Sequence, residues 1–167
     1  LGLELQRQLV DMGVATIQPA IAQLPTVTPI GMASLLPGAG KKLTILREGK
    51  DFFAAYDGQR LTSVPNRMKV FEQHFGDRFT QTTLSDFNSG KKAKVSDAVS
   101  LLVIRSTEID SHLENNPDTT LGLVHQTLKG IRVAIYRLKQ AGFTDVVIAT
   151  DHGFFLNGHA DAGDTCS

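Results

Sequence analysis

Near the end of the sequence, an apolar run stops at two potential metal ligands. Residues 146–149 read Val-Val-Ile-Ala and are followed by Thr150, Asp151, His152 and Gly153. A buried parallel strand has this pattern, and open α/β sheets place their active sites at the carboxyl ends of such strands. An aspartate here can also simply cap the structure after a strand. A carboxylate beside an imidazole suits a divalent cation of zinc or manganese character, whereas carboxylates alone favour magnesium or calcium.

A second group of ionisable residues follows another apolar run, residues 99–104. We expect a helix over residues 118–140 to join the two strands in a right-handed βαβ unit, because apolar residues recur there at steps of three and four. Both strands would then end at the same edge of the sheet. That edge would bring Asp151 and His152 together with an acidic loop: Glu108, Asp110, His112 and Glu114.

A threonine near the beginning adds a possible nucleophile. Thr28 stands directly before Pro29, at the start of a predicted helix over residues 29–36. Its simplest role is that of a helix N-cap. Its hydroxyl could instead attack phosphorus if a metal lowered its pKa, since a helix N-terminus favours an anion. The two roles are compatible, because a cap threonine is rigidly placed.

The elements that must position these residues alternate along the chain. We predict an α/β fold with a mostly parallel sheet flanked by helices, and we see no internal repeat and no domain boundary. The expected strands and hairpin cover residues 14–21, 43–46, 52–56, 79–83, 99–104 and 146–149. The expected helices begin the chain and then cover residues 29–36, 66–75 and 118–140.

Composition bounds the function only loosely. The 167 residues include 17 basic and 17 acidic side chains, so no net charge argues for nucleic acid or a membrane surface. The only cysteine is Cys166, which leaves no disulfide framework and favours a cytoplasmic location. The first residues have the pattern of a helix already in progress, and the last ones form a polar, glycine-rich segment. We therefore expect a piece of a longer protein, with an α/β domain over residues 1–156 and a flexible tail or interrupted loop over 157–167.

Three motifs together resemble the alkaline phosphatase superfamily, and in detail its PglZ domain, known from bacterial phage-defence systems. They are the Pro-Thr-Val-Thr-Pro sequence of residues 25–29, the Asp110 loop and the Thr-Asp-His-Gly sequence of residues 150–153. Residues 22–38 carry the most specific part, and the resemblance extends over most of the chain. It implies an alkaline-phosphatase-like fold truncated at both ends. It also implies a metal-dependent hydrolase of phosphomonoesters or phosphodiesters with two divalent cations, Zn, Mn or Mg.

The resemblance also implies roles for single residues. Thr28, rather than Thr26, matches the nucleophile that also binds one metal. Asp151 and His152 match an adjacent pair of ligands of the other metal. Asp110 matches a further metal ligand.

The partner of Asp110 usually lies four residues further on, where many members of the superfamily have histidine. Here that residue is Glu114, which we favour because PglZ-like sequences often carry an acid there; His112 is the alternative. Two implied ligands are missing: an aspartate would precede Leu1, and His159 is a poor match for a later histidine. We therefore expect the intact protein, rather than this fragment alone, to hold both cations and to be active.

Two hypotheses for the function result. In the first, the protein is a phosphatase or phosphodiesterase whose partner is a phosphate-ester substrate. In the second, it is a catalytically inactive scaffold or partner-binding component of a defence complex, which contacts other phage-defence proteins. The glutamate at position 114 favours the second, because it alters the ligand set of the metal. The neutral net charge indicates neither a nucleic acid nor a membrane as a partner.

Overall fold

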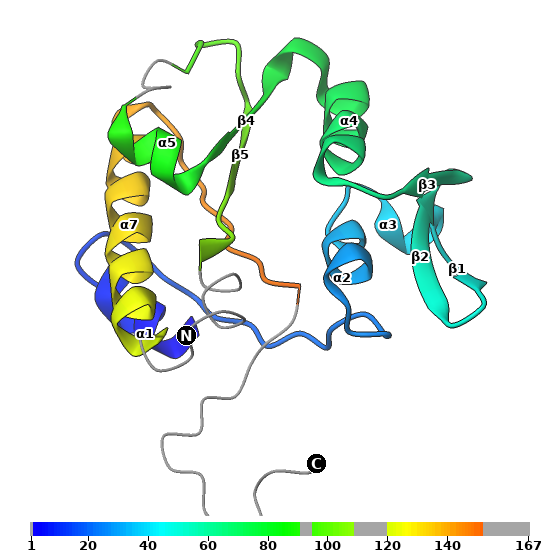
Figure 1. The fold of residues 1–167 in the computed structure, drawn as a ribbon. Helices are drawn as coiled ribbons and strands as arrows, with labels where there is room; N and C mark the ends of the chain where they lie inside the picture. Colours follow the sequence, from blue (N-terminus) through cyan, green and yellow to red (C-terminus); the bar gives the residue numbers. More distant parts are fainter. Residues whose placement is uncertain (1, 91–94, 109–119, 152–167) are drawn as a thin grey trace, which may run out of the picture. The chain divides into compact units, whose positions relative to one another are not determined.

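The computed structural model describes residues 2–90, 95–108 and 120–151. They fall into two compact units (Figure 1). The first unit comprises residues 1–20 and 64–148, and the second comprises residues 21–63 and 149–167. Each unit combines helices with one small sheet, parallel in the first and antiparallel in the second. The predicted α/β class is therefore confirmed, but the described sheets are small and only one of them is parallel.

The parallel sheet of the first unit consists of β4 (Phe79–Thr83) and β5 (Leu101–Arg105), paired in register from Phe79↔Leu101 to Thr83↔Arg105. The connection between them contains α5 (Leu84–Ser89). Thr83 caps this helix, because its Oγ1 accepts a hydrogen bond of 3.1 Å from the backbone N–H of Asp86. These strands match the predicted ranges closely.

The long helix α7 (Thr120–Gln140) packs against α5 and forms the core of this unit. Leu84 and Phe87 of α5 are buried with Ala134 and Leu138 of α7. Two polar contacts lock the pair: Asn88 donates to the carbonyl of Gly130 at 2.9 Å, and Arg137 donates to that of Phe87 at 2.8 Å. The predicted amphipathic helix is confirmed.

The remaining helices of the first unit are shorter. They are α1 (Gly2–Leu9), α4 (Val64–Phe75) and the 3-10 turn η1 (Gly76–Arg78) that leads into β4. Helix α1 lies against α7, where Arg132 donates to the carbonyl of Gln8 and forms an ion pair of 2.9 Å with Asp11. Phe71 of α4 stacks on Phe79 of β4, with ring centroids 5.5 Å apart.

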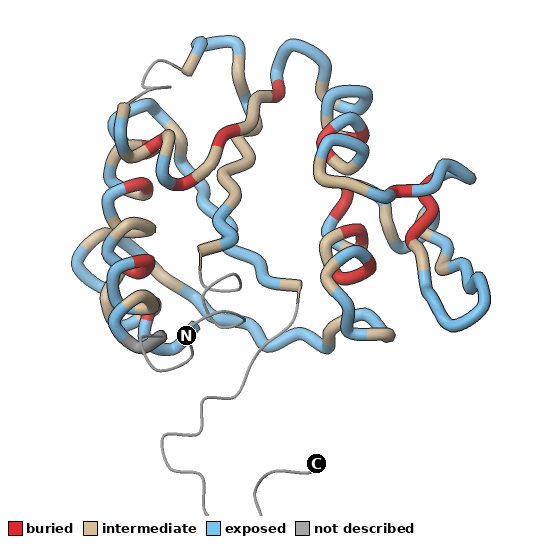
Figure 2. The backbone as a smooth tube through the Cα atoms, in the orientation of Figure 1, coloured by how far each residue is buried: buried red, intermediate tan, exposed pale blue. Residues whose placement is uncertain are grey.

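The second unit is a small antiparallel sheet covered by a helix. Its strands are β1 (Leu43–Glu48), β2 (Asp51–Tyr56) and β3 (Gln59–Leu61), and its helices are α2 (Thr28–Ser34) and α3 (Ala39–Lys42). Helix α2 packs on β2, and both elements contain buried residues (Figure 2). The Tyr56 hydroxyl donates to the carbonyl of Pro37 at 2.6 Å, which fixes the loop after α2 to the sheet.

An ion pair ties α3 to the turn after β2. Lys42 Nζ lies 2.9 Å from Asp57 Oδ2, and the hydrogen bond and charge of Asp57 raise the pKa of Lys42 above its ordinary value. Both side chains are largely exposed, so the pair adds little to the stability of the unit.

Two predicted strands are wrong. Residues 14–23 and 143–150 carry neither helix nor strand. Their apolar side chains are open to solvent, with Val14 97%, Ile21 99% and Val147 89% exposed. A strand forms only where a neighbouring strand supplies ladder hydrogen bonds. No described residues pair with these two runs, so their β propensity is not realised.

The other expected elements are formed, with boundaries shifted by a few residues. The hairpin of β1 and β2 turns at Gly49 and Lys50, as the Glu48↔Asp51 register requires.

Within the described ranges, no helix has both the length and the apolar character of a membrane-crossing segment.

The turn between β2 and β3 offers a test of the second unit. Tyr56 pairs with Gln59, so Asp57 and Gly58 form a two-residue hairpin loop, with φ of 47° and 78°. We predict that Gly58→Ala lowers the free energy of unfolding by about 1 kcal/mol, because alanine tolerates a positive φ poorly. Gly58→Asn should cost less, since asparagine adopts this conformation more readily. Urea denaturation followed by circular dichroism measures both, and equal effects would contradict the backbone explanation.

Candidate functional site

The structure describes only part of the predicted site. Thr28 and Asp151 both belong to the second unit. Thr26 is exposed in the segment before α2. The other candidates lie outside the described residues: Asp110, His112, Glu114, His152 and His159. The βαβ unit predicted to bring the Asp110 loop and Asp151 to one sheet edge is wrong, because residues 146–149 form no strand. Whether Asp110 lies near Asp151 stays a prediction.

Asp151 lies directly against helix α2. A Cβ atom built on Gly31 would be 2.7 Å from the Cβ of Asp151 and 3.0 Å from its carbonyl oxygen. Thr28 is the first residue of the same helix and lies three positions before Gly31, a spacing that places two residues on one helix face. The fold thus brings the segment that carries the carboxylate to the helix that carries the hydroxyl, although the two are distant in sequence.

Thr28 is not the helix cap, so that prediction is wrong. The N-cap is Val27, whose φ of −110° and ψ of 139° are extended. The N–H groups of Ile30 and Gly31 donate to the carbonyl of Val27, at 3.0 and 2.9 Å. Pro29 lies in the first turn, where backbone N–H groups have no acceptor within the helix, and proline has no such N–H group. Thr28 is therefore held by the helix itself, half-buried at its first position.

The carboxylate of Asp151 is partly withdrawn from solvent. The residue is half-buried, and its Oδ2 atom has no contact with water. The strand that should have delivered it is absent, because residues 143–150 form no ladder. Its position is instead defined by the close packing on α2.

The described donors fit one part of a metal site. Within residues 2–90, 95–108 and 120–151, no three His, Cys, Asp or Glu side chains gather as a metal-binding group. The Asp151 carboxylate and the Thr28 hydroxyl are oxygen donors, the class that hard divalent cations such as magnesium and manganese take.

Helix α2 is anchored in the core of the second unit. Ile30 and Ala33 are completely buried, and Leu36 just after the helix is 5% exposed. The helix packs on β2, in which Ala54 and Ala55 are also buried. The Ser34 hydroxyl donates to the carbonyl of Gly31 at 2.6 Å. This packing fixes the direction in which the helix presents Thr28.

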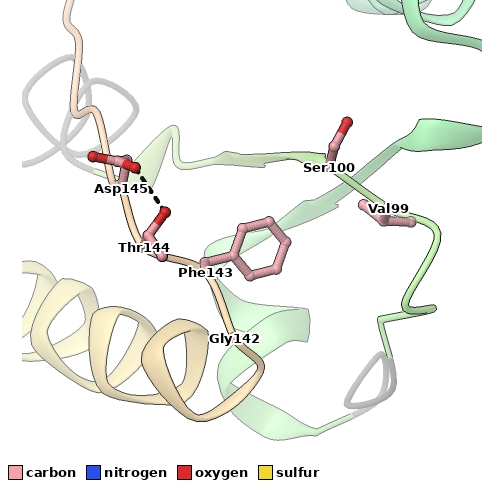
Figure 3. A pocket seen from close by; sticks show the side chains of 6 residues that line it. All are labelled: Val99, Ser100, Gly142, Phe143, Thr144 and Asp145. Atoms are coloured by element: carbon pink, nitrogen blue, oxygen red, sulfur yellow. Dashed lines mark hydrogen bonds between the residues drawn. The ribbon is translucent and has the colours of Figure 1, made fainter.

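Two cavities lie among the described residues of the first unit, and none of the predicted site residues lines them. A cavity of about 230 Å³ lies between Val99 and Ser100, which lead into β5, and the segment from Gly142 to Asp145 (Figure 3). Thr144 donates to the carboxylate of Asp145 at 2.7 Å. This cavity is at the amino end of β5, whereas active sites of parallel sheets lie at the carboxyl ends. A second cavity, of about 380 Å³, is lined mainly by uncharged residues of β4 and the segment before β5.

The sequence prediction overlooked Gly31. Its backbone is ordinary helix, so no turn or positive φ requires glycine there. A glycine inside a predicted helix costs stability relative to alanine, and such a residue usually has a packing or functional reason. The presence of a glycine inside a predicted helix was therefore the signal in the sequence that pointed to position 31.

A comparison with protein-family models identifies the chain. Residues 2–165 match the model described as the BREX system PglZ alkaline phosphatase-like domain. The chain belongs to the PglZ family. Comparisons with curated proteins and with solved structures find no match. For this PglZ domain, the family assignment supports an alkaline-phosphatase-like fold of a phage-defence system and agrees with the motifs around Thr28 and Asp151.

The burial of Ile30 predicts how firmly α2 is held. Ile30→Val should lower the free energy of unfolding by about 1 kcal/mol and Ile30→Ala by about 3 kcal/mol, because truncation leaves a cavity beside β2. Leu35 directly after the helix is 44% exposed, so Leu35→Ala should change stability by less than about 1 kcal/mol. Chemical denaturation of the three variants gives these values. Equal losses for Ile30→Ala and Leu35→Ala would show that α2 is not anchored by its buried face.

Proposed function

We propose that this PglZ domain, within the intact protein, hydrolyses phosphomonoesters or phosphodiesters in a metal-dependent reaction with Thr28 as the nucleophile. The observation that supports the proposal is the close approach of Asp151 to α2, with 2.7 Å between the Asp151 Cβ and a Cβ built on Gly31. A residue with a carboxylate and a residue with a hydroxyl thereby belong to one packed unit.

The cation ligands would come from three parts of the chain. Thr28, Asp110, Glu114, Asp151 and His152 would hold two divalent cations, with His112 as an alternative to Glu114. When bound, such cations neutralise phosphoryl oxygens and favour the deprotonated hydroxyl of a nucleophile. Whether the cations are Zn, Mn or Mg depends on how many of their ligands are imidazole nitrogens and how many are oxygens.

The proposed reaction has two displacements at phosphorus. Thr28 Oγ1 forms a bond to phosphorus, its proton passes to solvent, and the bond between phosphorus and the leaving oxygen breaks. Water then attacks the phosphothreonine ester, the bond from Oγ1 to phosphorus breaks, and the hydroxyl is restored. The first turn of α2 holds Thr28 in place, because a nucleophile must be oriented before it reacts.

Substitutions at position 28 test the nucleophile. With p-nitrophenyl phosphate and bis(p-nitrophenyl) phosphate as substrates and Mn²⁺ present, Thr28→Val should lower kcat by at least about 10³-fold, because it removes the attacking oxygen. Thr28→Ser should keep measurable turnover. Thr26→Val, which changes an exposed residue of the same motif, should resemble the wild type.

The outcomes separate the proposed enzyme from the scaffold. Unchanged turnover in Thr28→Val would exclude Thr28 as the nucleophile. A wild-type protein that binds Mn²⁺ and turns over neither substrate would instead support the scaffold function, for which the glutamate at position 114 is the specific indication.

A further inference from the structure

We infer that Gly31 is a positioning residue: its missing side chain lets the segment of Asp151 pack on α2 and so sets where this carboxylate lies relative to Thr28. The contact with Asp151 stands on the structure alone. Its effect on metal binding and turnover rests on the proposed function.

The contact is unusual among the described glycines. A Cβ built on Gly31 would meet the Cβ of Asp151 at 2.7 Å, its carbonyl oxygen at 3.0 Å and its Cα at 3.3 Å. These atoms belong to the backbone or are bonded directly to it, so no side-chain rotation relieves the clash. At Gly2 the close neighbour is Cδ1 of Ile17, the far end of a flexible side chain, at 2.6 Å.

The α2 side of the contact cannot yield easily. Helix α2 is fixed by the complete burial of Ile30 and Ala33 on either side of Gly31. A methyl group at position 31 must therefore move the Asp151 segment away from the helix. Such a displacement changes the distance between a metal ligand and the nucleophile, and a misplacement of about 1 Å can cost about 10²-fold in rate.

Gly40 provides a matched control. It also lies in a helix of the second unit, α3, has no positive φ, and has no atom within 4 Å of a built Cβ. Alanine is the better helix former at both positions. Gly40→Ala should leave the urea midpoint unchanged or raise it, whereas Gly31→Ala should lower it in spite of the better propensity.

A mutant cycle tests the contact without any activity. Asp151→Gly removes the Cβ nearest to position 31, so Gly31→Ala should lower the urea midpoint less in that background than in the wild type. Asp151→Ala keeps this Cβ, and the full loss should remain. An equal loss from Gly31→Ala in all backgrounds would overturn the contact and the inference with it.

Mn²⁺ titration by calorimetry tests the positioning role in the intact protein. Gly31→Ala should weaken Mn²⁺ binding at least about 10-fold and lower kcat by about 10²-fold, while Gly40→Ala matches the wild type. A less stable Gly31→Ala with unchanged Mn²⁺ affinity would reduce Gly31 to a packing residue and overturn the inference.

The two proposals can fail separately. A wild type without turnover, in which Gly31→Ala still weakens Mn²⁺ binding, would refute the proposed reaction and support the positioning role. Normal turnover and Mn²⁺ binding in Gly31→Ala would refute the positioning role and leave the reaction standing. A wild type that binds no Mn²⁺ would refute both, and the mutant cycle would then report only on packing.

Discussion

The packing of Asp151 on Gly31 is the contact on which the proposed site depends. Dense packing usually requires side chains that interlock, but here it requires the absence of one. The contact takes the place of the strand pairing that normally delivers an active-site carboxylate, because residues 143–150 form no ladder. It links a segment late in the chain to the first helix of the second unit and gives Asp151 a defined position.

The rest of the second unit holds the α2 side of this contact in place. Ile30 and Ala33 fix α2 on β2, and the β1–β2–β3 sheet supplies the surface against which the helix is held. The hydrogen bond from the Tyr56 hydroxyl to the carbonyl of Pro37 attaches the loop after α2 to the sheet. Because Val27 is the cap, Thr28 occupies the first position of the helix itself. The architecture thus agrees with a nucleophile placed by a short, buried helix.

Local patterns in the sequence predicted the elements that depend on local interactions. The hairpin of β1 and β2, the apolar stripe of α7 and the strand 79–83 all appear close to their predicted bounds. The strands predicted over residues 14–21 and 146–149 do not form. Apolar β-branched residues indicate that a segment can pair as a strand, but they do not show that a neighbouring strand is available. The motifs named Thr28 and Asp151 as candidates, and both residues belong to the second unit. Gly31 could not be assigned, since its need for glycine arises only from a contact between distant segments.

The central claim is that Thr28 and Asp151 form one phosphate-ester site. A crystal structure of the intact protein with Mn²⁺ and orthovanadate tests it directly, with anomalous scattering used to locate the manganese. We predict vanadium within bonding distance of Thr28 Oγ1 and manganese coordinated by the Asp151 carboxylate. Vanadate and manganese bound elsewhere, with Thr28 contacting neither, would contradict the account.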